Sequence, residues 1–311
     1  MAERCIGVDI GGTKVATAVL DGADLSTPKA VPTVTSSTEE LLAQLAGAID
    51  EAAAGDRDAI VGIGCPSVID FATGTARSSV NIPLKDVPLR SALQERTGLP
   101  VVVDNDATVA ALAEATDLAT GRATVDNLII LTVGTGVGGG IVIGGRIYRG
   151  ATGAAAELGH LIVAADLSRG APAGQEDFPQ PDSLEAHAAG GALGVLARAR
   201  GFADGKACVA AAQAGDATAV DALRILGERL GVGIANLINA FDPDEVVVGG
   251  GVSAAGDLLL QPAIAVAWPL VLPGIGTATT IRIARHGNQA GVIGAALLAR
   301  SELGAGSRLP R

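Results

Sequence analysis

The chain has few cysteines and no run of basic residues. Its 311 residues include three cysteines, widely separated at Cys5, Cys65 and Cys208. An odd and scattered set of thiols does not suit a disulfide framework and favours a reducing compartment, so we expect a cytoplasmic protein. The formal net charge is −11, and Lys and Arg form no cluster. The basic surface that a phosphate backbone requires is therefore missing, and we expect no nucleic-acid partner.

The sequence also lacks an apolar run that could cross a membrane as a helix. Residues 128–145 are interrupted by glycines, and residues 258–281 are interrupted by three prolines. A spanning helix needs about twenty helix-compatible apolar residues, so both stretches are better explained as protein core. No basic-then-apolar leader of a signal peptide is visible at the N-terminus. We expect no membrane partner.

Three separated glycine-rich turns, each after a β-branched run, are the most informative feature that is present. They are Ile6-Gly-Val-Asp-Ile-Gly-Gly-Thr-Lys14, Leu128-Ile-Ile-Leu-Thr-Val-Gly-Thr-Gly-Val-Gly-Gly-Gly140 and Val246-Val-Val-Gly-Gly-Gly-Val252. Glycine lets backbone N–H groups approach phosphate oxygens without a Cβ in the way, and the threonines add further donors. Together the three turns predict a nucleotide-binding site.

Strand-like and helical patterns alternate along the chain, which predicts the α/β class. We expect a β-hairpin from residues 5–10 and 15–20, strands at 59–64 and 101–103, and a second strand–turn–strand unit from Asn127. We expect helices at residues 39–54, 89–97, 106–115, 184–198, 216–239 and 291–303. Residues 166–182, rich in Gly, Pro and charge, predict a functional or disordered loop, and residues 304–311 a frayed tail.

The length suits two domains with a cleft between them rather than one core. We expect a small α/β domain at residues 1–120, with the C-terminal helix 291–303 packing back on it. A large α/β domain would then cover residues 121–290. Ligands of such proteins gather at the carboxyl ends of strands.

Two groups of carboxylates follow predicted strands. Asp9 lies beside the first glycine turn, where it suits a water-bridged Mg²⁺ near the β- and γ-phosphates, although an Asp can also simply cap its own turn. Asp104, Asn105 and Asp106 open a helix, and N-capping needs only one of them. Asp106 suits taking a proton from an acceptor hydroxyl, and Asn105 suits holding a sugar.

Further polar residues follow the second glycine turn. Glu157 and His160 lie in Glu-Leu-Gly-His, and Glu185 begins a helix after the Pro-rich loop. A lone Glu or His is more often an ordinary surface or hydrogen-bonded residue. Converging carboxylates and an imidazole can instead bind the ring hydroxyls of a sugar and reject analogues that leave them unpaired. We expect structural roles for His187, His286 and the cysteines.

At this point the chain resembles the ROK family of sugar kinases, from about Cys5 to Leu298. The resemblance is carried jointly by Asp9-Ile-Gly-Gly-Thr-Lys14, Gly64-Cys-Pro66, Asn81-Ile-Pro83, Asp104-Asn-Asp-Ala107, Gly134-Thr-Gly-Val-Gly-Gly-Gly140, Gly150-Ala-Thr-Gly153, Glu157-Leu-Gly-His160, Ser183-Leu-Glu-Ala186 and Gly249-Gly-Gly-Val-Ser253. The family implies an actin-like, ribonuclease H-like two-domain ATPase fold with a hinge. It also implies ATP and Mg²⁺ as cofactors and transfer of the γ-phosphoryl group to a hexose hydroxyl, usually the one on C6.

The resemblance also implies roles for single residues. It makes Asp106 the catalytic base. The sugar contacts would be Asn81, Asn105, Asp106, Glu157, His160 and Glu185. The first phosphate turn would comprise Gly11, Gly12, Thr13 and Lys14, the second Thr135 and Gly136, and the nucleoside side Gly250 and Gly251.

One element of the family pattern is missing. Many members follow the Glu-x-Gly-His element with cysteines that hold a structural zinc together with that His. This chain has no cysteine between Cys65 and Cys208. Tetrahedral structural zinc needs closed N/S ligation, so we expect no zinc. The sequence leaves open how His160 and the loop leading to Glu185 are held.

Three functions remain to be compared. The first is an ATP-dependent, glucokinase-like hexose kinase, and the second is a kinase of an amino sugar, an N-acetyl sugar or a sugar-like cyclitol. The third is a catalytically weak, sugar-sensing regulator, against which the retained Asp9 and Asp106 argue. We also expect a homodimer, because the apolar helix around residues 220–240 and the Pro-rich run 266–273 could bury surface against a copy.

Overall fold

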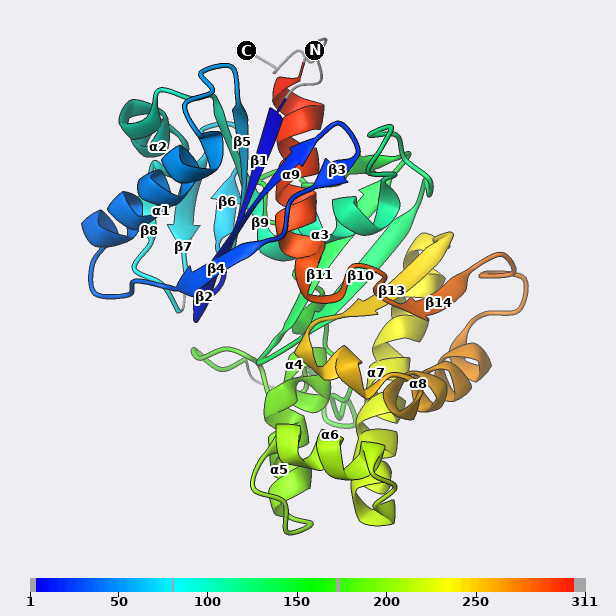
Figure 1. Ribbon diagram of the computed structural model, residues 1–311. Helices are drawn as coiled ribbons and strands as arrows, with labels where there is room; N and C mark the ends of the chain where they lie inside the picture. The colour runs from blue at the N-terminus through cyan, green and yellow to red at the C-terminus, as the bar shows by residue number, and fades with distance from the viewer. Residues whose placement is uncertain (1–3, 80, 172–173, 305–311) are drawn as a thin grey trace. The chain divides into compact units, whose positions relative to one another are not determined.

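The chain divides into two compact units in a computed structural model, which describes residues 4–79, 81–171 and 174–304 (Figure 1). The first unit comprises Met1–Asp126, Gly140–Ala156 and Asn288–Arg311. The second comprises Asn127–Gly139 and Glu157–Gly287. Neither unit is a single continuous segment of the chain.

The first unit is built on a mixed sheet with strand order β3-β2-β1-β5-β9, in which β4 also pairs with β2. β1 is antiparallel to β2 and parallel to β5, and β5 is parallel to β9. The strands are β1 (Arg4–Ile10), β2 (Lys14–Asp21), β3 (Asp24–Leu25), β4 (Lys29–Pro32), β5 (Ile60–Cys65) and β9 (Val101–Asn105). The predicted hairpin and the predicted strands at 59–64 and 101–103 are therefore confirmed.

Helices α1 (Thr38–Ala53), α2 (Leu89–Thr97), α3 (Asp106–Ala115) and α9 (Ala290–Leu303) complete this unit. The C-terminal helix α9 lies beside the N-terminal strand β1 (Figure 1). The approach is so close that a Cβ at Gly7 or Gly62 would overlap the backbone of α9. Glycine on β1 and β5 thus lets the helix seat directly on the sheet.

Helix α1 shows how the sequence sets an element and its packing. The Ser37 hydroxyl accepts the Glu40 N–H at 3.2 Å as the N-cap. The helix buries Leu41, Leu45 and Ile49 completely against the sheet. Fully burying each of these side chains contributes about 1.5–3 kcal/mol, so packing rather than the cap fixes the helix in place.

A small antiparallel sheet, in the order β6-β7-β8, also belongs to the first unit and was not anticipated from the sequence. Its strands are β6 (Val68–Asp70), β7 (Thr75–Ser78) and β8 (Lys85–Val87). Strand β11 (Val137–Ile143) begins in the second unit and ends in the first, where it pairs with β12 (Arg146–Ile147). Strands of two to four residues carry too little alternation to be seen in a sequence pattern.

The second unit contains parallel strands β10 (Leu128–Val133), β13 (Glu245–Gly249) and β14 (Thr280–Ile283), with β13 in the middle. Its long helices α7 (Ala217–Phe241) and α8 (Asp257–Leu270) pack along each other. The remaining helical segments are α4 (Leu184–Ala188), α5 (Gly190–Arg198), α6 (Gly205–Gln213), η1 (Leu158–His160) and η2 (Gly251–Ala255), and η3 (Gly287–Gln289) joins this unit to the first.

One helix expectation is wrong in this unit, and one further helix was not expected. The helix expected at 184–198 is broken at Ala189, whose extended backbone separates α4 from α5. A contact with another segment stabilises the break, because the Gly190 N–H donates to the Gly134 carbonyl at 2.7 Å. The sequence also gave no sign of α8, which contains Pro262 and Pro269. Proline lacks the N–H that a helix uses, so a sequence pattern predicts that a helix ends near proline. Here tertiary packing keeps the residues around both prolines helical.

Other expectations fall partly outside the described residues. In the loop expected at 166–182, residues 172 and 173 are not described, and the described part carries only an isolated bridge between Ser168 and Gly170. The tail expected at 304–311 lies outside the described residues except for Gly304. Within the described ranges, no helix combines the length and apolarity needed to traverse a bilayer. The three cysteine side chains are buried.

Candidate active-site residues in the two units

The Asp9 carboxylate stands at the end of β1 in the first unit. Asp9 pairs with Ala16 on β2 and with Gly64 on β5, so its backbone is fixed on both sides. The turn after it closes through the Gly11 N–H, which donates to the Lys14 carbonyl at 2.9 Å. The backbone of this first glycine turn is therefore held in a defined conformation beside the carboxylate.

Asn105 and Asp106 stand where β9 becomes α3. The Asn105 side chain is the N-cap and accepts the N–H groups of Ala107 at 2.9 Å and Thr108 at 3.1 Å. Asp106 is the first residue of the helix, and its own Oδ1 also accepts the Ala107 N–H at 2.9 Å. The capping need is met by Asn105, and the Asp106 carboxylate stands in the first turn, where the helix dipole favours negative charge.

Gly64 brings the two carboxylates close together. It lies on β5 between β1 and β9, and a Cβ placed on it would come 3.5 Å from the Asp106 Cα and 3.8 Å from Asp9 Oδ1. The same Cβ would meet the Val109 side chain at 2.8 Å. The absence of a side chain at Gly64 therefore allows α3 to approach the sheet, which brings Asp106 near Asp9.

This crowding changes the protonation of Asp9. Burial, and secondarily the negative charge of Asp106, raises the pKa of Asp9 from 3.8 to about 7, while Lys14 acts to lower it. The Asp9 side chain lies against the start of α9, since a Cβ at Gly291 would come 2.5 Å from its Cγ. Lys14 does not offset burial and the Asp106 charge, and a carboxyl group with a pKa raised this far is a recurrent property of functional sites.

The first turn and Asn81 are neighbours. A Cβ at Gly12 would come 3.1 Å from the Asn81 Cβ, and Thr13 and Lys14 are exposed at the tip of the turn. The Thr33 hydroxyl donates to the Gly11 carbonyl at 2.6 Å. The first unit thus brings together the sequence-predicted residues Asp9, Gly11, Gly12, Thr13, Lys14, Asn81, Asn105 and Asp106.

The second unit joins Glu185 to the second glycine turn. Glu185 Oε2 accepts the Val137 N–H at 2.7 Å, and a Cβ at Gly136 would overlap the same carboxylate. Thr135, at the tip of this turn, is exposed. Glu185, expected to contact a sugar, therefore also supports the turn expected to contact a phosphate.

Glu157 precedes the short helix η1 of the second unit as its N-cap, and His160 is the last residue of that helix. His160 Nε2 lies 3.8 Å from Glu157 Oε2, and the phenyl ring of Phe178 meets the His160 ring edge-on at 5.4 Å. Among the described residues, the buried Nδ1 of His160 has no hydrogen-bond partner. A Cβ at Gly159 would overlap the Val137 carbonyl, which places this segment beside the second turn and Glu185. An aromatic side chain of the loop thus contacts the histidine.

Gly250 and Gly251 lie beside the same turn. Gly250 has φ +81°, and a Cβ there would come 2.5 Å from the Val133 carbonyl at the end of β10. Both the positive φ and this close approach require glycine. The Ser253 hydroxyl closes the turn by donating to the Gly250 carbonyl at 2.7 Å.

One residue that the sequence analysis did not single out stands next to the carboxylates of the first unit. Arg149 Nε donates to Asp104 Oδ2 at 2.7 Å, and Arg149 Nη2 donates to Glu302 Oε1 at 3.0 Å. Asp104 is buried, which raises its pKa, while Arg149 acts to lower it. Asp104 and Arg149 are 45 positions apart, and no local pattern signals their pairing.

Within the described ranges, no group of three or more His, Cys, Asp or Glu side chains could hold a metal ion. Asp9 is instead placed singly, beside the first turn, where a cation bridged to phosphate oxygens would need only one protein carboxylate. The expectation that the chain holds no zinc stays a prediction.

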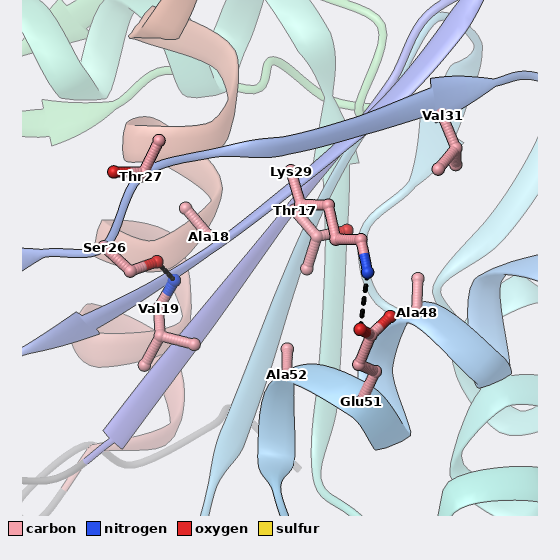
Figure 2. A pocket seen from close by; sticks show the side chains of 10 residues that line it. All are labelled: Thr17, Ala18, Val19, Ser26, Thr27, Lys29, Val31, Ala48, Glu51 and Ala52. Carbon is pink, nitrogen blue, oxygen red and sulfur yellow. Dashed lines mark hydrogen bonds and ion pairs between the residues drawn. The ribbon is translucent and has the colours of Figure 1, made fainter.

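A pocket of about 280 Å³ in the first unit contains none of the predicted site residues (Figure 2). It lies between β2, β4 and α1, and Thr17, Val31 and Ala52 are among the side chains that line it. Lys29 and Glu51 form an exposed ion pair across its rim at 2.5 Å. The concave surface there is separate from the strand ends that carry Asp9 and Asp106.

Strand-end carboxylates beside glycine-rich turns, in α/β units, define a phosphate-binding α/β protein. The chain belongs to the ROK family, whose model matches residues 5–302. It is 37% identical to a glucokinase of Halalkalibacterium halodurans, with 97% of each chain covered. It is 38% identical to a glucokinase of Streptomyces coelicolor, covering 95% of this chain and 97% of that one.

A solved structure gives the same relationship. The chain is similar to a ROK family glucokinase from Streptomyces griseus, determined in complex with glucose and AMPPNP, with a TM-score of 0.80 and 34% identity. The match covers 96% of this chain and 99% of the other. The expected α/β class and actin-like fold are confirmed by this likeness and by the strands and helices described above.

Proposed function

We propose that this chain transfers the γ-phosphoryl group of ATP to the C6 hydroxyl of a hexose, with Asp106 as the general base. The chain is an ATP-dependent sugar kinase of the ROK family, as its similarity to glucokinases over nearly its full length indicates. The observation that carries the assignment of the base is the position of Asp106, in the first turn of α3 and next to Asp9.

The proposed reaction is an in-line displacement. The C6 oxygen forms a bond to the γ-phosphorus, the bond from that phosphorus to the β–γ bridging oxygen breaks, and ADP leaves with the electron pair. The Asp106 carboxylate accepts the hydroxyl proton. Because the transition state of such a transfer is loose, positioning and charge neutralisation supply most of the catalysis.

The residues of the first turn fit the phosphates of ATP and its Mg²⁺. Lys14 only partly offsets the burial of Asp9, and a divalent cation beside Asp9 would favour its ionised form. When bound, Mg²⁺ neutralises charge that develops on the β- and γ-phosphate oxygens. We assign Gly11, Gly12, Thr13 and Lys14, and with them Thr135 and Gly136, to the phosphates, and Gly250 and Gly251 to the nucleoside.

We assign the sugar to Asn81, Asn105, Asp106, Glu157, His160 and Glu185. Asn105 is already used as a helix cap through its oxygen, which leaves its amide nitrogen, 3.4 Å from the Ser67 carbonyl, as the group that can donate to a hydroxyl. The unsatisfied Nδ1 of His160 is an acceptor or donor that a ligand hydroxyl would satisfy. Such buried polar groups give specificity because a wrong sugar leaves them unpaired.

Kinetics of Asp106→Asn test the assignment of the base. Losing a general base lowers kcat by about 10²- to 10⁴-fold, and since the amide keeps the shape of the side chain, the KM for ATP should stay within about threefold. Asp50→Asn, an exposed position on α1, is the matched control and should retain full activity. An Asp106→Asn enzyme that turns over at the wild-type rate would refute the role.

An ADP-coupled assay across glucose, mannose, glucosamine and N-acetylglucosamine identifies the substrate. We expect glucose to give the highest kcat/KM. Preference for an amino or N-acetyl sugar would select the second function considered above. Inactivity on all hexoses, together with retained sugar binding, would select the regulator.

We also propose that the chain forms a homodimer. Support comes from apolar side chains exposed near the ends of α7 and α8, namely Phe241, Trp268, Leu270 and Leu272. The central part of α7 is buried within its own unit, so the run at 266–273 is the better supported half of the expectation. Light scattering tests it, and a monomer at micromolar concentration would exclude it.

A further inference from the structure

Arg149 connects three parts of the first unit that are far apart in the sequence. Its guanidinium donates to Asp104 at the end of β9 and to Glu302 on α9. The guanidinium carbon also lies 3.5 Å from the centre of the Phe71 ring, which follows β6. Four-fifths of the Arg149 side chain is buried, so these contacts are made largely away from water.

The backbone around Arg149 is held in place independently of its side chain. The preceding Tyr148 N–H donates to the Ile141 carbonyl at 2.8 Å, and the Ala155 N–H donates to the Arg149 carbonyl at 3.1 Å. Gly140, on the same strand as Ile141, lies so close to α3 that a Cβ there would overlap the Ala107 carbonyl. The guanidinium therefore starts from a fixed point beside the first turn of α3.

Asp104 connects the fixed guanidinium of Arg149 to the next two residues. While its Oδ2 accepts from Arg149, its Oδ1 accepts the Asn105 N–H at 2.9 Å. The Asn105 side chain in turn caps the helix that begins with Asp106. A continuous series of hydrogen bonds thus runs from Arg149 to the start of α3.

We propose that Arg149 is a positioning residue for the phosphoryl transfer, which orients Asn105 and Asp106 by locking the carboxylate of Asp104. The inference rests on the proposed role of Asp106 as base. Asp104 is 1% exposed and needs a counter-charge in place to remain an anion there. The planar fork of arginine and its stacking on Phe71 fix the direction of the Asp104 carboxylate, which a lysine would not do.

Arg149→Gln is the primary test. We expect kcat to fall by about 10- to 100-fold, because small displacements of a reacting group carry a large kinetic penalty. The KM for ATP should change by less than about threefold, since none of the phosphate contacts is touched. Arg149→Lys should fall between the wild type and Arg149→Gln. Arg77→Gln, which removes an exposed Arg–Asp pair in the same unit, is the matched control and should change kcat by less than about twofold.

The double variant Asp104→Asn/Arg149→Gln separates positioning from general loss of structure. An amide at position 104 can still accept the Asn105 N–H and needs no counter-charge, so we expect kcat to recover at least about fivefold over Arg149→Gln. Arg149→Gln with wild-type kcat and only a lower melting temperature would overturn the proposal. A double variant no more active than Arg149→Gln would overturn it as well.

A measurement that does not use activity distinguishes this proposal from the proposed function. Amide hydrogen exchange of the segment 105–108 should be about tenfold faster in Arg149→Gln than in the wild type, because the cap at Asn105 loosens. Unchanged exchange would contradict the positioning role even if the enzyme is a hexose kinase. A wild-type protein inactive on all hexoses, with faster exchange in the variant, would contradict the function alone.

Discussion

Replacing Asp9 by asparagine should stabilise the ligand-free protein above neutral pH while lowering its activity. Asp9 sits where burial and the nearby Asp106 charge disfavour its ionised form, which raises its pKa from 3.8 to about 7. The folded state therefore binds a proton at this position over a pH range in which the unfolded chain has released it. In that range stability falls as the pH rises.

The magnitude follows from the two pKa values. Each unit of difference corresponds to about 1.36 kcal/mol, so the shift from 3.8 to about 7 corresponds to about 4 kcal/mol. The contribution of the Asp9 proton to the free energy of unfolding is fully present below pH 4. It is lost progressively between pH 4 and 7 and stays lost above pH 7. Asparagine has no charge to lose, so Asp9→Asn should show none of this dependence.

Urea unfolding of both proteins at pH 5, 6, 7 and 8, without nucleotide or Mg²⁺, measures the effect. The wild type should lose up to about 3 kcal/mol relative to Asp9→Asn between pH 5 and 8. All other side chains are the same in both proteins, so their effects cancel in the comparison. Parallel pH profiles would refute the reasoning that burial keeps Asp9 protonated up to about pH 7. The kcat of the variant should fall at least about tenfold if Asp9 holds Mg²⁺ as proposed, since that contact is lost.

Two further perturbations test the packing and the second unit. Leu45→Ala on α1 should lower the free energy of unfolding by about 2–5 kcal/mol, because Leu45 is completely buried, and thermal denaturation with unchanged KM values would support this. Glu185→Gln keeps an oxygen that can accept the Val137 N–H but loses the charge, so kcat/KM for glucose should fall by about 10- to 100-fold with little change in melting temperature; an unchanged kcat/KM would remove Glu185 from the sugar contacts.

The sequence indicated those parts of the candidate site that lie at strand ends. Asp9 and Asp106 could be located because each follows an apolar run and precedes a turn or a helix, and parallel strands bring such ends to one edge of a sheet. The N-cap could be narrowed to three adjacent residues, of which Asn105 proved to be the one. Local patterns with a strong period were sufficient for these elements.

Contacts between distant segments could not be foreseen in the same way. Arg149 pairs with a carboxylate 45 residues earlier and another 153 residues later, and nothing in its neighbourhood marks it. The break between α4 and α5 depends on a hydrogen bond from Gly190 to Gly134, on a different segment. The contact of Phe178 with His160 likewise depends on how a Pro-rich loop folds back. In each case tertiary structure decides what local propensity leaves open.

The packing of α9 on β1 and β5 has a consequence for folding during synthesis of the chain. Strands β1 and β5 leave the ribosome early, whereas the helix that covers them, at residues 290–303, is synthesised much later. At about 5–20 residues per second, the face of that sheet stays uncovered by α9 for roughly 10–35 s after Asp126 has been synthesised. During this interval the glycine-lined, apolar surface is open to chaperones, and a chain cut short before α9 should never complete its first unit.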